Sequence, residues 1–220
     1  MDWSYVQEII PRFVQAALVT LRLSAWGVSL SLLLGLAVAL VTSYRVRPFD
    51  SLARAYIELS RNTPLLIQLF FLYYGLPKIG IHWDGFTCGV IALTFLGGSY
   101  MAEALRTSLQ AVPRGQVESA RAIGLRRAQI LRHVGLPQAL AIIKPALFGQ
   151  YMNIAKNTSL GMAVGLAELS YRSRQAEAET FMSFQVYGIG TVLYIVLVFV
   201  IGLLGRKMSR RRQRSAWQQA

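Results

Sequence analysis

Two long charge-free stretches constrain what this chain can fold into. No charged residue occurs from Leu23 to Tyr44, and none occurs from Ser183 to Gly205. Each stretch reaches the roughly 20 residues with which a helix crosses about 30 Å of hydrocarbon. The mean hydropathy is +0.42 and only 15% of the residues are charged. The chain is therefore predicted to be an integral membrane protein.

Three further hydrophobic segments lie between these stretches, and each is short or interrupted. Such segments suit helices that are buried among neighbours or line a cavity. We therefore predict an all-α, multi-span helical bundle with five transmembrane helices, which forms a single domain over residues 1–220. The predicted spans are residues 20–43, 60–78, 86–106, 137–160 and 184–206, each to within a few residues.

The second span has recognisable start and stop signals. Asn62 and Thr63 are residue types that cap helices, and Pro64 suits an opening turn because it lacks the amide hydrogen that is unpaired there. These three residues are predicted to have a structural role. The triplet Gly75-Leu76-Pro77 is expected to end the helix.

The distribution of Lys and Arg predicts the orientation of the spans. With the N-terminus outside, sixteen of the 23 basic residues are cytoplasmic and four lie outside. The C-terminus is then cytoplasmic, and its basic tail RKMSRRRQRS is interpreted as an anchor for anionic lipid and not as a nucleic-acid site. The polar segment 168–182 becomes an outer loop, either a docking surface or a solvated loop.

Redox and metal chemistry is not indicated. Cys88 is the only cysteine, and His82 and His133 lie far apart in the sequence. An intrachain disulfide is impossible, and no set of Cys and His residues has the spacing of a metal site.

The cytoplasmic loop 114–136 is amphipathic. Its apolar or small residues recur at helical spacing and give one face that packs, whereas the opposite face is charged. Gly124 permits either a bend between two short helices or the close approach of another backbone. Pro137 is expected to reset the chain direction as the fourth span begins. The residues of the packing face are Val117, Ala120, Gly124, Ala128, Leu131 and Val134.

This loop resembles a family signature. Glu118-Ser119-Ala120, three residues, Gly124, nine residues and Val134-Gly135-Leu136-Pro137 are similar to Glu-Ala-Ala, three, Gly, nine, Ile-x-Leu-Pro in membrane permease subunits of bacterial ABC importers. The segments 61–66, 102–103 and 156–160 resemble the polar amino-acid uptake branch of that family. Ser119 and Val134 depart from the signature, but both are close in size to the family residues.

The resemblance implies an ATP-driven importer of a polar amino acid or a derivative. It implies that the loop is a coupling helix seated in a groove of a cytoplasmic ATPase dimer. The coupling residues are expected to be Glu118, Ser119, Ala120, Gly124, Leu125 and Pro137. It further implies a second permease copy or homologous permease, an extracytoplasmic solute-binding protein, and a location in the bacterial inner membrane.

The chain is predicted not to be an enzyme. No lysine is followed by Ser or Thr, so the phosphate-binding loop of an ATPase is absent. We expect no cofactor on this chain and no catalytic residue, because ATP and Mg²⁺ would bind to the partner ATPase.

Ionisable side chains inside spans are candidates for a substrate pathway, because their burial in a membrane is costly. Lys156 and Glu103 would complement the carboxylate and ammonium groups of an amino acid, with hydrogen bonds from Asn157, Thr158 and Ser159. A local ion pair between Glu103 and Arg106 is the alternative.

Two other functions are kept open. A gradient-driven secondary transporter or channel needs no ATPase and leaves the coupling-type loop unexplained. A membrane scaffold or sensor would depend on the basic tail and would tolerate large side chains at Gly124.

Overall fold

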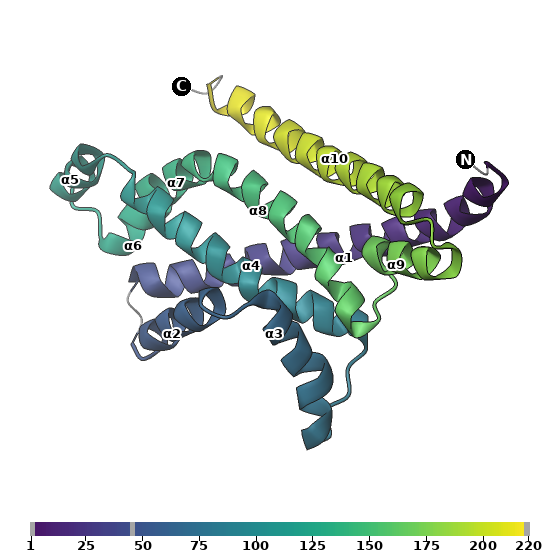
Figure 1. Cartoon of the computed structure of the whole chain (residues 1–220). Coiled ribbons are helices and arrows are strands. Elements are labelled where there is room, and N and C mark those ends of the chain that lie inside the picture. The colour runs from purple at the N-terminus through teal and green to yellow at the C-terminus, as the bar shows by residue number, and fades with distance from the viewer. Residues whose placement is uncertain (1–2, 45–46, 218–220) are drawn as a thin grey trace. The chain divides into compact units, whose positions relative to one another are not determined.

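A computed structural model describes residues 3–44 and 47–217, with side chains for residues 9–44 and 47–203. Within these residues the chain is helical and contains no strand, as predicted (Figure 1). The side chains of the basic tail lie outside the described part. The elements are α1 Trp3–Tyr44, α2 Phe49–Arg61, α3 Leu65–Phe70, η1 Phe71–Gly75, η2 Leu76–Ile79, α4 Gly85–Gln110, α5 Arg114–Ala122, α6 Arg127–Ile130, η3 Leu131–Gly135, α7 Leu136–Ile142, α8 Lys144–Asn157, η4 Thr158–Val164, α9 Leu169–Thr180 and α10 Ser183–Trp217.

Three helices of the described ranges are long and apolar enough to cross a membrane. They are Ile9–Tyr44, Gly85–Gln110 and Ser183–Leu203, and they correspond to the predicted first, third and fifth spans. The first begins well before residue 20. The helix can include charged residues such as Arg12, because a charged side chain on the helix surface leaves the backbone hydrogen bonds intact. The guanidinium of Arg12 forms an ion pair with Glu179 at 3.2 Å.

The other two predicted spans are broken helices. Residues 60–78 begin with the end of α2 and then cover all but the last residue of a 15-residue apolar stretch, Leu65–Ile79. Residues 137–160 are divided at Ile143, where α7 ends and α8 begins with Pro145 in its first turn. Because proline has no N–H and clashes with the preceding turn, continuous helices are disfavoured at these places.

The break before α3 differs in detail from the prediction. Asn62 is the C-cap of α2, and its N–H donates to the carbonyl of Glu58 at 3.0 Å. The Thr63 hydroxyl donates back to the carbonyl of Leu59. The N-cap of α3 is Pro64, without a side-chain capping hydrogen bond. The residues therefore mark the break as expected, but Asn62 and Thr63 do not cap α3.

The two Gly-Leu-Pro triplets, at residues 75–77 and 135–137, each follow the start of a π-helical turn, which is wider than an α-helical turn. In η1 the N–H of Leu76 reaches back five residues to Phe71, and in η3 that of Leu136 reaches back to Leu131. Such π turns place an extra residue in the helix just before the proline and so relieve its clash. The end of the helix lies within one turn of Gly75-Leu76-Pro77, as predicted: a single 3-10 turn continues to Ile79, where Gly80 with φ 87° ends it.

Segment 168–182 is also not a loop. Residues 169–180 form α9, whose buried residues Leu169, Ser173 and Ala176 recur at helical spacing. The many charges of the segment obscured this periodicity, because charged residues occupy the remaining faces.

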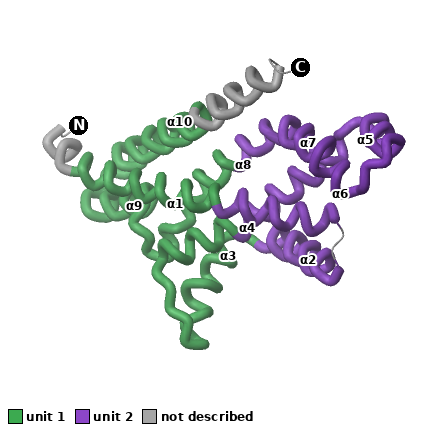
Figure 2. The backbone as a smooth tube through the Cα atoms, turned by 180° about the vertical axis from the view of Figure 1, so that it is seen from behind, with its two compact units in different colours: residues 1–29, 64–94, 151–220 green, residues 30–63, 95–150 purple. Residues whose placement is uncertain are grey.

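The chain divides into two compact units, each with its own hydrophobic core (Figure 2). Unit 1 contains residues 1–29, 64–94 and 151–220, and its core includes Phe13, Leu169 and Val186. Unit 2 contains residues 30–63 and 95–150, and its core includes Ala39 and Ala139. Within unit 2 the carbonyl of Phe95 accepts hydrogen bonds from the hydroxyls of Tyr56 and Ser60, which ties α2 to α4.

In unit 2, α1 packs closely against α4 at Gly35, which leads to a testable prediction. A Cβ at this position would lie 2.6 Å from Cβ of Met101 and 2.9 Å from the carbonyl oxygen of Gly98. Gly35→Ala should therefore lower the free energy of unfolding by about 1–3 kcal/mol through overpacking, despite the better helix propensity of Ala. Thermal unfolding of the purified protein in detergent measures this loss.

Gly149 of α8 is the matched control in the same unit. A Cβ there would meet no atom within 4 Å, and the backbone conformation is ordinary. Gly149→Ala should leave stability unchanged or raise it. Equal midpoints for the two variants would contradict the close approach of α1 and α4.

Candidate functional site

The loop 114–136 folds as two short helices with a sharp turn at Gly124. After α5 ends, the N–H of Gly124 donates to the carbonyl of Arg121 at 2.9 Å, and the N–H of Leu125 donates to that of Ala120 at 3.1 Å. These two bonds form a Schellman motif, which closes a helix C-terminus. Gly124 has φ 83°, a conformation that residues with a Cβ rarely adopt.

The geometry decides between the two roles predicted for Gly124. A Cβ at this position would meet no atom of this chain within 4 Å, so within the chain the positive φ of the bend is what requires the glycine. The predicted packing face is therefore interrupted. Ala120 is buried, Val117, Leu131 and Val134 are half-buried, and Gly124 and Ala128 are exposed.

Helix α5 presents its polar face to the exterior. Ala120 is only 5% exposed, whereas the adjacent Glu118 and Ser119 are exposed. The large side chain of Ile123, the C-cap residue of α5, is 78% exposed. The side chains of Glu118, Ser119 and Ile123 are thus accessible at the surface, while Ala120 is packed against the unit.

The loop is fastened to the rest of unit 2. Helix α5 packs against η3, and the side-chain amide of Gln138 on α7 donates to both the Gln116 side chain on α5 and the carbonyl of Val134. At the start of α6, the N–H of Arg126 donates to the side chain of Gln129 at 2.8 Å. A displacement of α5 would therefore act directly on α7, which contains Pro137.

The predicted substrate residues of α8 and η4 have unequal environments. Lys156 is exposed and Asn157 is half-buried. Thr158 is buried, and its hydroxyl donates to the carbonyl of Ala155 at 2.7 Å, while the Ser159 hydroxyl donates to that of Lys156 at 2.8 Å. Both hydroxyls thus bond within their own helix, a common arrangement for Ser and Thr.

No amino-acid-sized space adjoins these residues in the single chain's described cavities. Asn157 and Thr158 line a cavity of about 10 Å³, close to the minimum for one water molecule.

Glu103 forms the local ion pair that was the alternative to a substrate role. Its two carboxylate oxygens accept from Nε of Arg106 at 2.8 Å and from Nη2 at 2.5 Å. Such a bidentate pair is geometrically favourable and satisfies both groups.

A buried carboxylate that the sequence interpretation missed is Glu168. This N-cap of α9 is fully buried and accepts from the N–H groups of Ser170 and Tyr171 and from the hydroxyl of Tyr194 at 2.5 Å. Burial raises the pKa of Glu168 above its usual range, although the hydrogen bonds oppose this shift. An acidic residue preceding a helix is a capping signal, but its burial depends on α10, which the sequence does not place.

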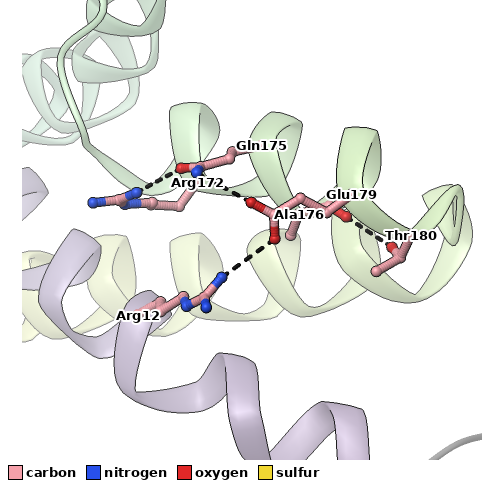
Figure 3. A network of polar contacts seen from close by, with 6 residues as sticks. All are labelled: Arg12, Arg172, Gln175, Ala176, Glu179 and Thr180. Atoms are coloured by element: carbon pink, nitrogen blue, oxygen red, sulfur yellow. Dashed lines mark hydrogen bonds and ion pairs between the residues drawn. The ribbon is translucent and has the colours of Figure 1, made fainter.

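A second polar network joins α9 to α1 (Figure 3). Arg12 donates to Glu179, whose other oxygen accepts from Gln175 at 3.1 Å, and Gln175 in turn accepts from Arg172 at 2.5 Å. These groups are on the exposed side of α9, so they orient the helix more than they stabilise it.

Comparison with known proteins shows the family. Residues 31–214 match the family described as binding-protein-dependent transport system inner membrane component. The chain belongs to this family. It is a permease, a translocation component and not an enzyme, and the prediction from the loop signature is confirmed.

Individual relatives agree over nearly the whole length. A probable glutamine ABC transporter permease of Bacillus subtilis is 37% identical over 89% of this chain and 91% of its own length. The arginine transport system permease of Bacillus subtilis is 30% identical over 96% and 97%. A solved amino acid ABC transporter with histidines has a TM-score of 0.88 at 33% identity, covering 96% of this chain and 99% of that one. An inward-facing methionine ABC transporter, at 23% identity and a TM-score of 0.78, shares the fold.

The Schellman motif leads to a prediction about the permease loop. Gly124→Ala should destabilise the end of α5 by about 1 kcal/mol because Ala strains at positive φ, and Gly124→Asn should retain more of the cap. Gly115→Ala, at a site in α5 with ordinary backbone and open space, is the control. Hydrogen exchange of the backbone amides at positions 124 and 125 measures the stability of the cap. Equal exchange rates in all three variants would contradict the role of Gly124 in the cap.

The buried carboxylate leads to a prediction about pH. Because the folded-state pKa of Glu168 is raised, the folded state binds more protons than the unfolded state between the ordinary and the raised pKa. The contribution of this residue to stability is therefore present at low pH and is lost as pH rises through that window. Glu168→Gln should remove this dependence, and unfolding midpoints across the pH range measure it.

Glu179→Gln, which removes an exposed carboxylate from the same helix, is the control and should keep the wild-type pH dependence. If Glu168→Gln and wild type gave parallel curves, the assignment of a raised pKa would be wrong.

Proposed function

We propose that this permease imports a polar amino acid or a derivative into the cytoplasm, driven by ATP hydrolysis in a partner. The names of the relatives, which include glutamine and arginine permeases, support the substrate class. The proposal includes five spans, in which α3–η2 and α7–η4 form the second and fourth despite their breaks. It also includes an outer N-terminus and a cytoplasmic C-terminus, as favoured by the distribution of Lys and Arg.

This proposal rests on the way in which α5 is fixed to unit 2 on one face and exposed on the other. Its C-terminus is closed by the Schellman motif, Ala120 holds it against the unit, and Glu118 faces outward. We infer that Glu118, Ser119, Ala120, Gly124 and Leu125 contact an ATPase dimer, which binds the ATP and Mg²⁺. Pro137 lies in the first turn of α7, and it would take part in passing a movement of the loop to that helix.

The remaining partners follow from the proposed importer. A second permease, either a copy or a homologue, would complete the pathway, and an extracytoplasmic binding protein would deliver the substrate. We place Lys156 and Asn157 toward that pathway, since Lys156 is exposed and Asn157 is half-buried at the end of α8. Thr158 and Ser159 would contribute through the conformation of the helix end, and Glu103 through its pair with Arg106.

The test is ATP hydrolysis by the permease and its ATPase in liposomes. A binding protein loaded with one amino acid should stimulate hydrolysis, and a panel of amino acids identifies the substrate. Glu118→Lys and Gly124→Asp should reduce the stimulation at least tenfold, equivalent to about 1.4 kcal/mol of lost coupling, while the permease remains folded.

Arg132→Gln, which changes an exposed charge in the same loop outside the signature, is the control and should retain the stimulation. Uptake driven by an ion gradient in liposomes without ATPase would instead favour the secondary transporter. Wild-type stimulation in both loop variants would contradict the assignment of α5 as the contact.

A further inference from the structure

A cavity behind the proposed coupling loop has no role in the importer as described so far. It has a volume of about 870 Å³ and lies entirely within unit 2, the purple part of Figure 2. Its walls come from the last residues of α1, from α2, from the end of α4, and from α5, α6 and η3. The volume is that of a ligand site and not of a packing defect.

The charges around this cavity are unequally neutralised. Arg106 is paired with Glu103 inside the wall, and Arg54 is paired with Asp50 at 3.1 Å. Arg121 and Arg127 also line the cavity, and within the described residues neither has a hydrogen bond or ion pair from its side chain to a carboxylate. The further lining acid, Glu58, offsets only one of these two charges.

The rest of the wall is largely apolar. Ile57, Leu109 and Ile130 are among its residues, and they belong to three different elements. The cavity lining thus combines the guanidinium groups of Arg121 and Arg127 with aliphatic side chains, and this combination is complementary to an amphiphile whose polar end is anionic. Guanidinium groups are especially suited to phosphate, which they bind with paired hydrogen bonds.

The position of the cavity indicates where such a molecule comes from. Its wall includes Tyr44 and Gln110, which are the final residues of two helices long enough to span the membrane. The ends of spans lie at the level of the lipid headgroups, where tyrosine is enriched. An entrance at this depth adjoins phospholipid phosphate groups on one side and acyl chains on the other.

We propose that this cavity binds an anionic phospholipid, with its phosphate on Arg121 and Arg127 and its acyl region against the apolar wall. The cytoplasmic location of the site rests on the proposed function, and it matches the leaflet in which anionic lipid attracts basic segments. Because Arg121 belongs to α5 and Arg127 to α6, the bound phosphate joins the two sides of the bend at Gly124. The lipid thereby holds the coupling loop against the ends of the spans.

The test is lipid binding to the purified full-length permease in detergent. Phosphatidylglycerol and phosphatidylcholine are each titrated and counted by native mass spectrometry. Wild type should bind phosphatidylglycerol in preference to phosphatidylcholine, and the double variant Arg121→Gln with Arg127→Gln should bind it roughly 30-fold more weakly, the product of two lost charge contacts. Equal affinity of wild type and this variant would overturn the site.

Arg114→Gln with Arg132→Gln is the matched control. It removes two exposed positive charges from the same loop but none from the cavity wall, so wild-type affinity is expected. A loss as large as that of the cavity variant would show non-specific attraction to the basic loop and would overturn the proposal. Unfolding midpoints confirm that both variants are folded.

Glycerol phosphate distinguishes lipid from a soluble phosphate ester. Since it lacks acyl chains, it should compete poorly with phosphatidylglycerol, and competition at equal concentration would overturn the lipid as the occupant. The binding measurement needs neither ATPase nor nucleotide. It therefore succeeds or fails independently of the Glu118→Lys experiment, which tests the proposed function by hydrolysis.

Discussion

The requirement that every backbone polar group be satisfied within the protein governs this structure. In hydrocarbon an unpaired N–H or carbonyl costs several kcal/mol, yet prolines interrupt the helices repeatedly. The chain meets this requirement locally. Wide turns precede Pro77 and Pro137, the Thr63 hydroxyl donates to a carbonyl at the end of α2, and Gln138 donates to a carbonyl beside η3. These hydrogen bonds pair several of the backbone groups that the interruptions would otherwise leave free.

The same local solutions explain why the loop signature needs its residue types. Gly124 permits the conformation that closes α5, and Ala120 is small enough to be buried where α5 meets the unit. Pro137 follows the wide turn through which the loop enters α7. Because Gln138 also binds the side chain of Gln116, the loop and the following helix are mechanically connected. The signature thus describes how one helix ends and the next begins.

Much of the fold could be predicted from the sequence because long apolar helices depend on local composition. The charge-free stretches predicted α1 and α10, and the residue spacing from Glu118 to Pro137 predicted the family. The broken spans were harder, since proline marks a probable interruption without saying whether the helix stops or widens. Gly75-Leu76-Pro77 illustrates this, because its turn widens and the helical segment continues to Ile79.

The sequence by itself determined the membrane class, the all-helical fold and the family, because each depends on composition or on spacing along one segment. The tertiary structure decided the environments of the polar side chains. Glu168 is buried because α10 brings Tyr194 against it, whereas the pair of Glu103 with Arg106 is local to α4 and could be proposed from the sequence. Arg121 and Arg127 meet at one cavity because the chain bends between them. Burial and charge pairing depend on which segments meet in space, and one-dimensional periodicity does not contain that information.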